Sequence, residues 1–332
     1  MKNLSTSLLF VLLALAGQLA SAQTIRRVNN NGITGTAIYA TLQLAHDAAV
    51  NGDIIQVEPS TTAYGTLTCT KQLTIVGPGY FLGENQPPAL QANTIPATIS
   101  TVNFNNGSAG TTISGLVSNS YFYVSTNNIT IQRCNILNGY IYLGYTLITN
   151  GAVIRQNYSL GVQDSSPSTN SLITNNIFIN GNVALSGVGN TGEFSNNTII
   201  NTTVQLNNYT VRNNYFNNGF TPTANTNWAY NFFTNSTLPT LGTASNNTAN
   251  VPLASVFVLS PGSQFDGWYK LKTGINNAVG AGQGGVDIGA TGSATGYGYR
   301  FGGLPAIPAI YQLNQSVTGN TLNVNLSTRS NN

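Results

Sequence analysis

The chain has 332 residues, of which only 6% are charged, and a formal net charge of +3. Its few positive charges are scattered, so nucleic acid and anionic membrane surfaces are excluded as expected partners. The CxxC, HExxH, P-loop and GxSxG patterns are absent from the sequence. Redox, zinc, nucleotide and serine-hydrolase chemistry therefore lack support, and no metal or cofactor is expected.

Residues 1–22 have the pattern of a secretory signal peptide, and its short n-region suggests a bacterial one. Lys2 supplies the positive start, residues 8–16 form the apolar core, and small residues precede a cleavage point after Ala22. That core is too short to span a bilayer, and no later segment is long and apolar enough. The mature chain, residues 23–332, is expected to be exported to an extracellular, periplasmic or cell-surface location.

Residues 41–51 are the one segment with a clear helical pattern. Thr41 can cap the helix and Gly52 can end it. The apolar residues share one face: Leu42, Ala45 and Ala49. The only histidine, His46, lies here and is interpreted as a solvated residue beside Asp47.

Between residues 129 and 235 a short phrase recurs about every 20 residues, which predicts stacked coils, extending over residues 53–235, rather than one closed core. Aligned by eye, the phrase ends at six positions: Cys134, Gln156, Asn176, Asn197, Asn214 and Asn231. Asn tolerates a left-handed backbone, so it favours a tight bend between two strands. Its side chain can also form hydrogen bonds with an Asn at the same place in the next coil, which predicts a ladder of stacked Asn side chains. Cys134 and Gln156 would interrupt that ladder at its start.

Three apolar groups recur in each coil. The first stands three residues before the aligned positions: Ile131, Val153, Ile173, Phe194, Val211 and Trp228. The second stands two residues after them: Ile136, Tyr158, Phe178, Ile199, Phe216 and Phe233. The third alternates with polar residues: Phe122 and Val124, Ile141 and Leu143, Val162, Val183 and Leu185, Val204 and Leu206. Period-2 alternation is typical of half-buried strands, so we expect an all-β chain with three short strands in each coil.

With this repeat and the helix before it, the chain resembles the secreted right-handed parallel β-helix proteins of the pectate-lyase-like superfamily. The resemblance covers nearly all of the mature chain. It implies an N-terminal amphipathic helix that covers the open end of the β-helix, where unpaired strands would invite aggregation. It does not imply one activity, because the superfamily includes lyases, hydrolases, tailspikes and non-catalytic surface proteins.

Beyond residue 235 the repeat fades, and residues 252–332 are predicted to form a C-terminal cap region of the same domain. Residues 304–308 read as a stiff extended connection, and residues 321–326 alternate like a last strand. Asp266 and Asp287 in this region match no known metal-binding loop. The chain is expected to be a monomer.

The two cysteines, Cys69 and Cys134, could form a disulfide in an exported protein. They fall at least two coils apart, however. Coils stack about 4.8 Å apart, so two steps exceed the separation that a disulfide allows. Two buried free thiols are therefore expected.

Polysaccharide-cleaving members of the superfamily need paired carboxylates, or a calcium-binding carboxylate cluster with a basic residue. Between residues 91 and 260 only Asp164 and Glu193 are acidic, and their offsets in the repeat place them on different faces. Arg133 and Arg155 share a column in the alignment, but no carboxylate stands beside them. The sequence thus argues against a familiar catalytic site.

Four tyrosines flank the third apolar group on two adjacent coils and should face outward: Tyr121, Tyr123, Tyr140 and Tyr142. Aromatic rings beside amides and hydroxyls suit sugar rings. The alternative interpretation is that β-sheet surfaces favour Tyr and that Tyr pairs stabilise stacking.

Three functions are compatible with these observations. The favoured one is an exported, non-catalytic β-helix that binds carbohydrate or serves as an adhesive or cell-surface structural module. The alternative is a polysaccharide-degrading lyase or glycoside hydrolase. An ice-binding solenoid is disfavoured because the coils lack a regular Thr-x-Thr array.

Overall fold

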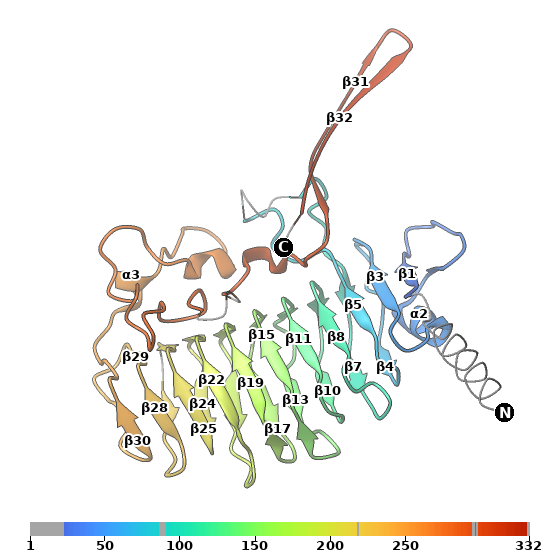
Figure 1. Cartoon of the computed structure of the whole chain (residues 1–332). Helices are drawn as coiled ribbons and strands as arrows, with labels where there is room; N and C mark the ends of the chain where they lie inside the picture. Colours follow the sequence, from blue (N-terminus) through green and yellow to red (C-terminus); the bar gives the residue numbers. More distant parts are fainter. Residues whose placement is uncertain (1–22, 86–90, 218, 294–295, 297, 331–332) are drawn as a thin grey trace, which may run out of the picture.

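Three parallel β-sheets run the length of an elongated β-helix, as a computed structural model of the chain shows (Figure 1). The structure describes residues 23–85, 91–217, 219–293, 296 and 298–330. The predicted signal peptide lies outside the described residues. Within each of the three sheets, all the strand pairs are parallel, and each strand other than the two at the edges pairs with strands of the coils on either side.

The first sheet has twelve strands. They pair in the order β2 (Ile38–Tyr39), β1 (Ile25–Val28), β3 (Ile54–Val57), β5 (Thr74–Val76), β8 (Thr112–Ser114), β11 (Thr130–Gln132), β15 (Val153–Arg155), β19 (Ser171–Thr174), β22 (Gly192–Ser195), β25 (Tyr209–Arg212), β28 (Asn227–Ala229) and β30 (Thr243–Ser245).

The second and third sheets have eight strands each. The second contains β4 (Leu67–Cys69), β7 (Val102–Phe104), β10 (Phe122–Val124), β13 (Ile141–Leu143), β17 (Val162–Asp164), β21 (Asn182–Leu185), β24 (Thr203–Leu206) and β27 (Phe220–Thr221). The third contains β6 (Thr98–Ile99), β9 (Val117–Ser118), β12 (Asn135–Ile136), β16 (Tyr158–Ser159), β20 (Ile177–Ile179), β23 (Thr198–Ile200), β26 (Tyr215–Phe216) and β29 (Phe232–Phe233). A two-residue pair, β14 (Thr149–Asn150) with β18 (Ser168–Thr169), lies outside these sheets.

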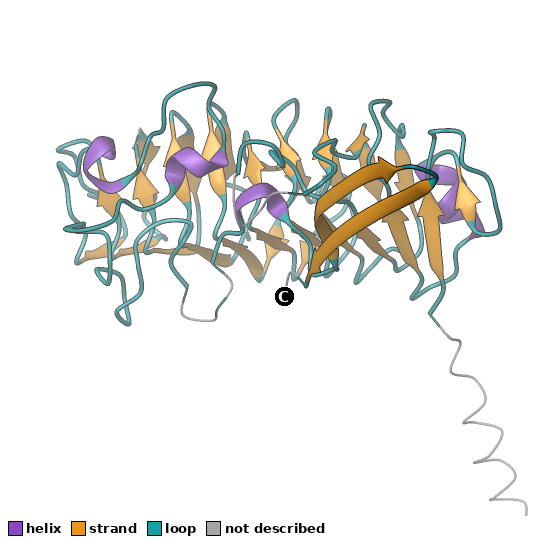
Figure 2. Ribbon diagram, turned by 90° about the horizontal axis from the view of Figure 1, so that it is seen from above, coloured by secondary structure: helices purple, strands orange, loops and turns teal. Residues whose placement is uncertain are grey.

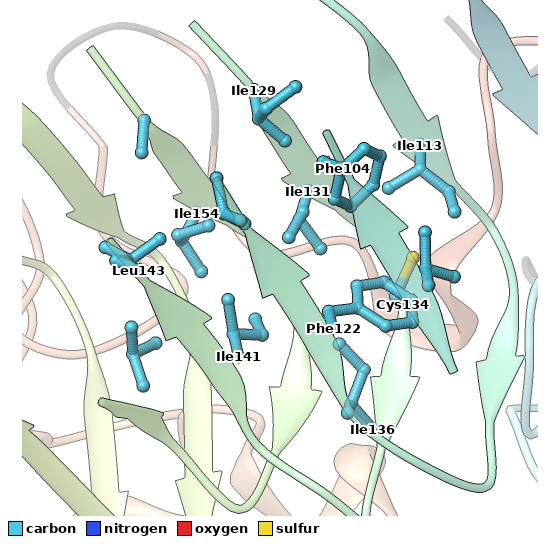
Figure 3. Close-up of a cluster of buried hydrophobic side chains, with 14 of the residues drawn as sticks. Phe104, Ile113, Phe122, Ile129, Ile131, Cys134, Ile136, Ile141, Leu143 and Ile154 are labelled. Carbon is cyan, nitrogen blue, oxygen red and sulfur yellow. The ribbon is translucent and has the colours of Figure 1, made fainter. Parts of the chain in front are cut away.

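The three predicted apolar groups form the inward columns of the three sheets, and Figure 3 shows their side chains packed together inside the coils. One coil is misplaced by a residue in the sequence alignment. Ile131 is level with Ile154, not Val153, and Ile136 is level with Ser159, not Tyr158. Two adjacent apolar residues, Val153 and Ile154, made the choice ambiguous, and a one-residue slip exchanges the two faces of a strand.

The predicted asparagine ladder is present, with the same correction. Its members are Asn157, Asn176, Asn197, Asn214, Asn231 and Asn247. Within the ladder, each Asn accepts two hydrogen bonds at its side-chain oxygen from the Asn of the preceding coil. For example, Asn197 Oδ1 accepts from the backbone N–H and from the Nδ2 of Asn176. Asn157, not Gln156, therefore holds the ladder position, and Cys134 alone interrupts it by donating only its backbone N–H.

The residue before each ladder position takes the left-handed conformation. These corner residues are Arg133, Gln156, Asn175, Asn196, Asn213, Tyr230 and Asn246, with φ between 51° and 59°. Asn is common among them because its short polar side chain tolerates this region. The left-handed bend predicted for the ladder positions therefore lies one residue earlier.

The N-terminal helix α2 (Leu42–Ala48) packs on the first strands, as the sequence predicts (Figure 1). Thr41 caps it by accepting from the Leu44 N–H at 3.2 Å. His46 is only 3% exposed, so its interpretation as a solvated residue is wrong. Its Nε2 accepts from the backbone N–H of Thr70 at 3.0 Å, and its Nδ1 lies 3.0 Å from Asp47 Oδ1.

Residues 251–293 and 298–304, here called the strap, run along the side of the solenoid. They include α3 (Leu253–Val256) and the 3₁₀ turns η2 (Asp266–Tyr269) and η3 (Phe301–Gly303), which Figure 2 shows lying over the strands. Their apolar side chains cover the outer face of the third sheet, so that strands such as β20 and β23 are buried on both faces. The region predicted as a C-terminal cap thus lies on a flank of the coils.

Five corner residues hold the strap in register. Along the coils, Arg133, Gln156, Asn175 and Asn196 donate in turn to the carbonyls of Leu304, Gly298, Ala290 and Asp287, and Asn213 accepts from Gln283 N–H. The strap therefore runs back along the solenoid, from its C-terminal end toward its early coils.

The chain ends in a hairpin of β31 (Ala309–Thr318) and β32 (Thr321–Arg329) that projects from the body (Figure 1). The predicted strand at residues 321–326 is part of β32. Both Cys69 and Cys134 are buried free thiols, as expected. Among the described residues, no helix is long and apolar enough to cross a membrane.

Candidate functional site

The four tyrosines predicted to face outward do so: Tyr123 and Tyr142 lie in β10 and β13 of the second sheet, and Tyr121 and Tyr140 directly precede these strands. Tyr123 is paired with Tyr142, and Phe122 N–H donates to the carbonyl of Tyr140, which places Tyr121 beside Tyr140. The inward residues between them, such as Phe122 and Ile141, are fully buried. The alternation of the two strands therefore puts all four phenol rings on one outer surface.

The rings pack on one another across the two coils. The centroids of Tyr121 and Tyr123 are 5.7 Å apart, and those of Tyr123 and Tyr142 are 5.5 Å apart, with 21° between the planes in each case. Tyr140 meets Tyr142 edge-on at 6.4 Å. Such contacts hold each ring in place, so the surface is stiff before any ligand arrives.

A fifth tyrosine, Tyr145, joins this cluster, and sequence reasoning missed it. Its ring centroid is 4.1 Å from that of Tyr123. Gly144 takes φ +60° immediately before it, and a Cβ there would collide with the backbone of Ser166. That glycine, directly after the last inward residue Leu143, was the signal of a bend that turns the next side chain back over the strand.

The tyrosine cluster, Tyr121, Tyr123, Tyr140, Tyr142 and Tyr145, is partly open to solvent. Tyr145 is 44% exposed and Tyr121 36% exposed, and the other three are half-buried. Burial raises the pKa of Tyr123 and of Tyr142, and the neighbouring phenols raise both further. The two central rings are therefore neutral at neutral pH.

Uncharged polar side chains continue the outward column on both sides of the cluster. Asn103 of β7 is paired with Tyr123, and Gln163 of β17 is paired with Tyr142. Both amides are half-exposed. The surface thus offers apolar ring area between amide donors and acceptors, without a charged group in the column.

The two central carboxylates do not meet. Asp164 ends β17 in the second sheet, and Glu193 lies in β22 of the first sheet, as their offsets predict. Asp164 Oδ2 accepts from Gly187 N–H at 2.9 Å and from Asn190 Nδ2 at 2.7 Å. Glu193 forms an ion pair with Arg212 at 2.8 Å. Each carboxylate is thus bonded to groups of the following coil.

The two arginines are not stacked in one column, which corrects the alignment. Arg155 is level with Gln132, and its Nε donates to Gln132 Oε1 at 2.7 Å. Arg133 donates to Gln156 and to the strap, and burial lowers its pKa. Both side chains thus bond to amide and carbonyl groups of neighbouring segments.

The two acidic residues of the strap that were considered as ligands, Asp266 and Asp287, accept hydrogen bonds that hold the strap in place. Asp266 is fully buried and accepts from Asn85 Nδ2, Tyr299 Oη and Gly302 N–H at 2.7, 3.1 and 2.7 Å. Asp287 accepts from Gly280 N–H at 2.9 Å. Within the part of the chain that the structure describes, no three His, Cys, Asp or Glu residues gather as a metal site would require.

A scan against known protein-family models and a search of curated proteins found no match for this chain.

Proposed function

We propose that the protein is an exported, non-catalytic β-helix that binds carbohydrate through the tyrosine cluster. Export rests on the predicted signal peptide, and kinship with the pectate-lyase-like superfamily rests on the repeat and its parallel coils. The observation that carries binding is the set of five packed, partly exposed tyrosines on one outer surface, flanked by Asn103 and Gln163.

Sugar rings have apolar faces and hydroxyl edges, and the tyrosine cluster and its flanking amides contain groups that can bind both. Aromatic area contacts the C–H faces, while amides and phenol hydroxyls exchange hydrogen bonds with the sugar hydroxyls. Because the cluster spans two coils and the amides add one coil on either side, an extended polymer of several sugar units fits it better than a monosaccharide. Without charge in the column, the favoured ligand is a neutral or weakly acidic glycan.

The alternative of a polysaccharide-degrading enzyme has weaker support. Hydrolysis requires two carboxyl groups on either side of the scissile bond, and lyase chemistry requires a base beside a charge-stabilising cluster. Asp164 and Glu193 lie on different sheets, so they cannot act as a pair on one bond. Asp164 is level with Leu143, beside the strand that carries Tyr142, but its Oδ2 already accepts from Gly187 and Asn190. A glycan held by the tyrosines would be bound without being cleaved.

The test is a glycan array with the purified protein, followed by titration of the best polysaccharide. The double variant Tyr123→Ala/Tyr142→Ala should lose binding and keep the fold, because neither side chain belongs to the inward columns. The control is Tyr311→Ala, which removes an exposed tyrosine from the distant hairpin. It should bind as the unmodified protein does.

Two outcomes would contradict the proposal. Unchanged binding by the double variant would remove the tyrosine cluster as the site. Release of shorter products from any polysaccharide would favour the enzyme, and single substitutions of Asp164, Glu193, Arg133 and Arg155 would then locate its catalytic groups.

A further inference from the structure

The C-terminal hairpin has one entirely polar face and one mostly apolar face. Cross-strand partners share a face, and the pairs alternate along the hairpin. On one face lie Leu313 with Leu326, Gln315 with Val324, and Val317 with Leu322. On the other lie Gln312 with Ser327, Asn314 with Asn325, Ser316 with Asn323, and Thr318 with Thr321.

No described part of the chain covers this apolar face. Its five aliphatic side chains are between 51% and 73% exposed, although the same residue types are fully buried in the coils. The hairpin is fixed to the body at its base, where Ala92 N–H donates to the Ile310 carbonyl at 2.9 Å. A groove of about 360 Å³ beside this base is lined by Leu313 among others, and does not include Val317, Leu322, Val324 or Leu326.

A two-stranded hairpin in water is marginally stable unless its apolar face is packed against something. Exposed apolar surface that is contiguous and rimmed by polar residues marks an interaction site. The regular alternation over both strands therefore indicates that a partner covers this face.

A second copy of the chain could cover this apolar face with its own apolar face. A two-fold contact places the same surface on both partners, and this surface is complementary to itself, apolar against apolar. Residues 309–328 carry no charged side chain, so two hairpins approach without repulsion. At roughly 100 Å² for each of the five aliphatic side chains, two copies would bury about 1,000 Å², the lower limit for a specific interface.

We infer that the protein forms a two-fold dimer in which the apolar faces of two C-terminal hairpins pack against each other. The contact involves Leu313, Val317, Leu322, Val324 and Leu326 of each copy and leaves the tyrosine cluster free. It is independent of the proposed glycan binding and departs from the monomer expected from the sequence. Because the contact lies at the lower limit of area for a specific interface, we expect a weak dimer with a dissociation constant on the order of micromolar.

Sedimentation velocity of the purified protein, from about 1 to about 100 µM, tests the dimer directly. The unmodified protein should shift from monomer to dimer across this range. Val324→Lys should raise the dissociation constant roughly a hundredfold or more, because the dimer would bury an unpaired ammonium group. The matched control Asn323→Lys puts the same charge one residue away on the polar face and should dimerise normally.

Cross-linking gives a second readout that does not depend on a destabilising charge. Since Cys69 and Cys134 are buried, a cysteine on the hairpin would be the exposed thiol of the described chain. Val324→Cys should form a disulfide-linked dimer when oxygen and a copper catalyst oxidise the two facing thiols. Asn323→Cys should stay monomeric on a denaturing gel.

Other results would overturn the inference. One is that the protein remains a monomer at every concentration. Another is that Val324→Lys leaves the dimer intact, because association would then use another surface. Binding of the monomer to vesicles of phosphatidylethanolamine and phosphatidylglycerol, lost in Val324→Lys, would assign the face to a lipid surface instead.

Discussion

The hydroxyl of Tyr80 lies 2.6 Å from the hydroxyl of Tyr299, which is 219 residues further along the chain. Tyr299 in turn donates to Asp266, and Tyr80 N–H donates to the carbonyl of Gly302. All four residues are buried where the strap meets the early coils. This network joins the last part of the chain to its first coils, so the strap and the solenoid should unfold together.

Stability should depend on pH through Asp266. Burial raises the pKa of this carboxyl from 3.8 to about 6. Between about pH 4 and pH 6 the folded state holds a proton that the unfolded chain has released, so the contribution of Asp266 is favourable at low pH and is lost as the pH rises through 6. From pH 4 to pH 7 this contribution falls by up to about 3 kcal/mol.

Asp266→Asn should remove this pH dependence. The buried Oδ1 of Asn85 has no hydrogen-bond partner among the described residues and can accept from the new amide after a rotation. Urea unfolding at pH 4 and pH 7 should show the variant gaining stability relative to the unmodified protein at the higher pH. Equal pH dependence in the two proteins would contradict the assignment, and Asp266→Leu should be less stable at both pH values.

The asparagine ladder should be as important for stability as the apolar columns. Asn197→Leu keeps the branched shape of the side chain but leaves the buried N–H of Asn176 without its acceptor, which now lies at 2.9 Å. We expect a loss of about 2–4 kcal/mol in the free energy of unfolding, because more than one buried polar group is left unpaired. Gln205→Leu, on the exposed side of β24, should change stability by less than about 0.5 kcal/mol.

The fold was predictable because each coil repeats the same physical requirements. Apolar residues at period 2 and Asn beside a left-handed corner recur often enough to be recognised without knowing the strand pairing. The strap has no sequence repeat, and its contacts with Arg133 and Asn175 join segments that are far apart in the chain. No spacing pattern in the sequence could therefore predict where the strap lies. Tyr145 was missed because its place depends on the bend at Gly144.

The corrected register predicts a large loss of stability at one residue and a small loss at its neighbour. Ile154→Ala should cost roughly 2–5 kcal/mol by leaving a cavity, as should Ile173→Ala or Phe216→Ala. Val153→Ala should cost much less, because Val153 is only partly buried on the other side of the strand. Chemical denaturation of both variants measures the two losses in the free energy of unfolding. A larger loss for Val153→Ala would favour the sequence alignment, in which Val153 and not Ile154 points inward.

Lys71 should stabilise the N-terminal helix. Its Nζ donates to the carbonyls of His46, Asp47 and Ala49 at 2.8–2.9 Å, at the end of α2 where backbone acceptors lack helical partners. Lys71→Met should lower the free energy of unfolding by about 1–2 kcal/mol. Lys272→Met is the control, since its exposed ammonium bonds to one carbonyl and the change should stay within about 0.5 kcal/mol.

Glycan binding at the tyrosine cluster should vary little with ionic strength. Ring stacking and amide hydrogen bonds are short-range and uncharged, so raising salt from about 0.05 to about 0.5 M should change the dissociation constant less than about twofold. Tyr145→Ala should weaken binding because it removes the most exposed ring of the cluster and the support that this ring gives Tyr123. Isothermal titration measures both effects. A steep loss of affinity with salt would instead indicate an acidic glycan held by charge, and the arginines outside the cluster would then be the residues to substitute.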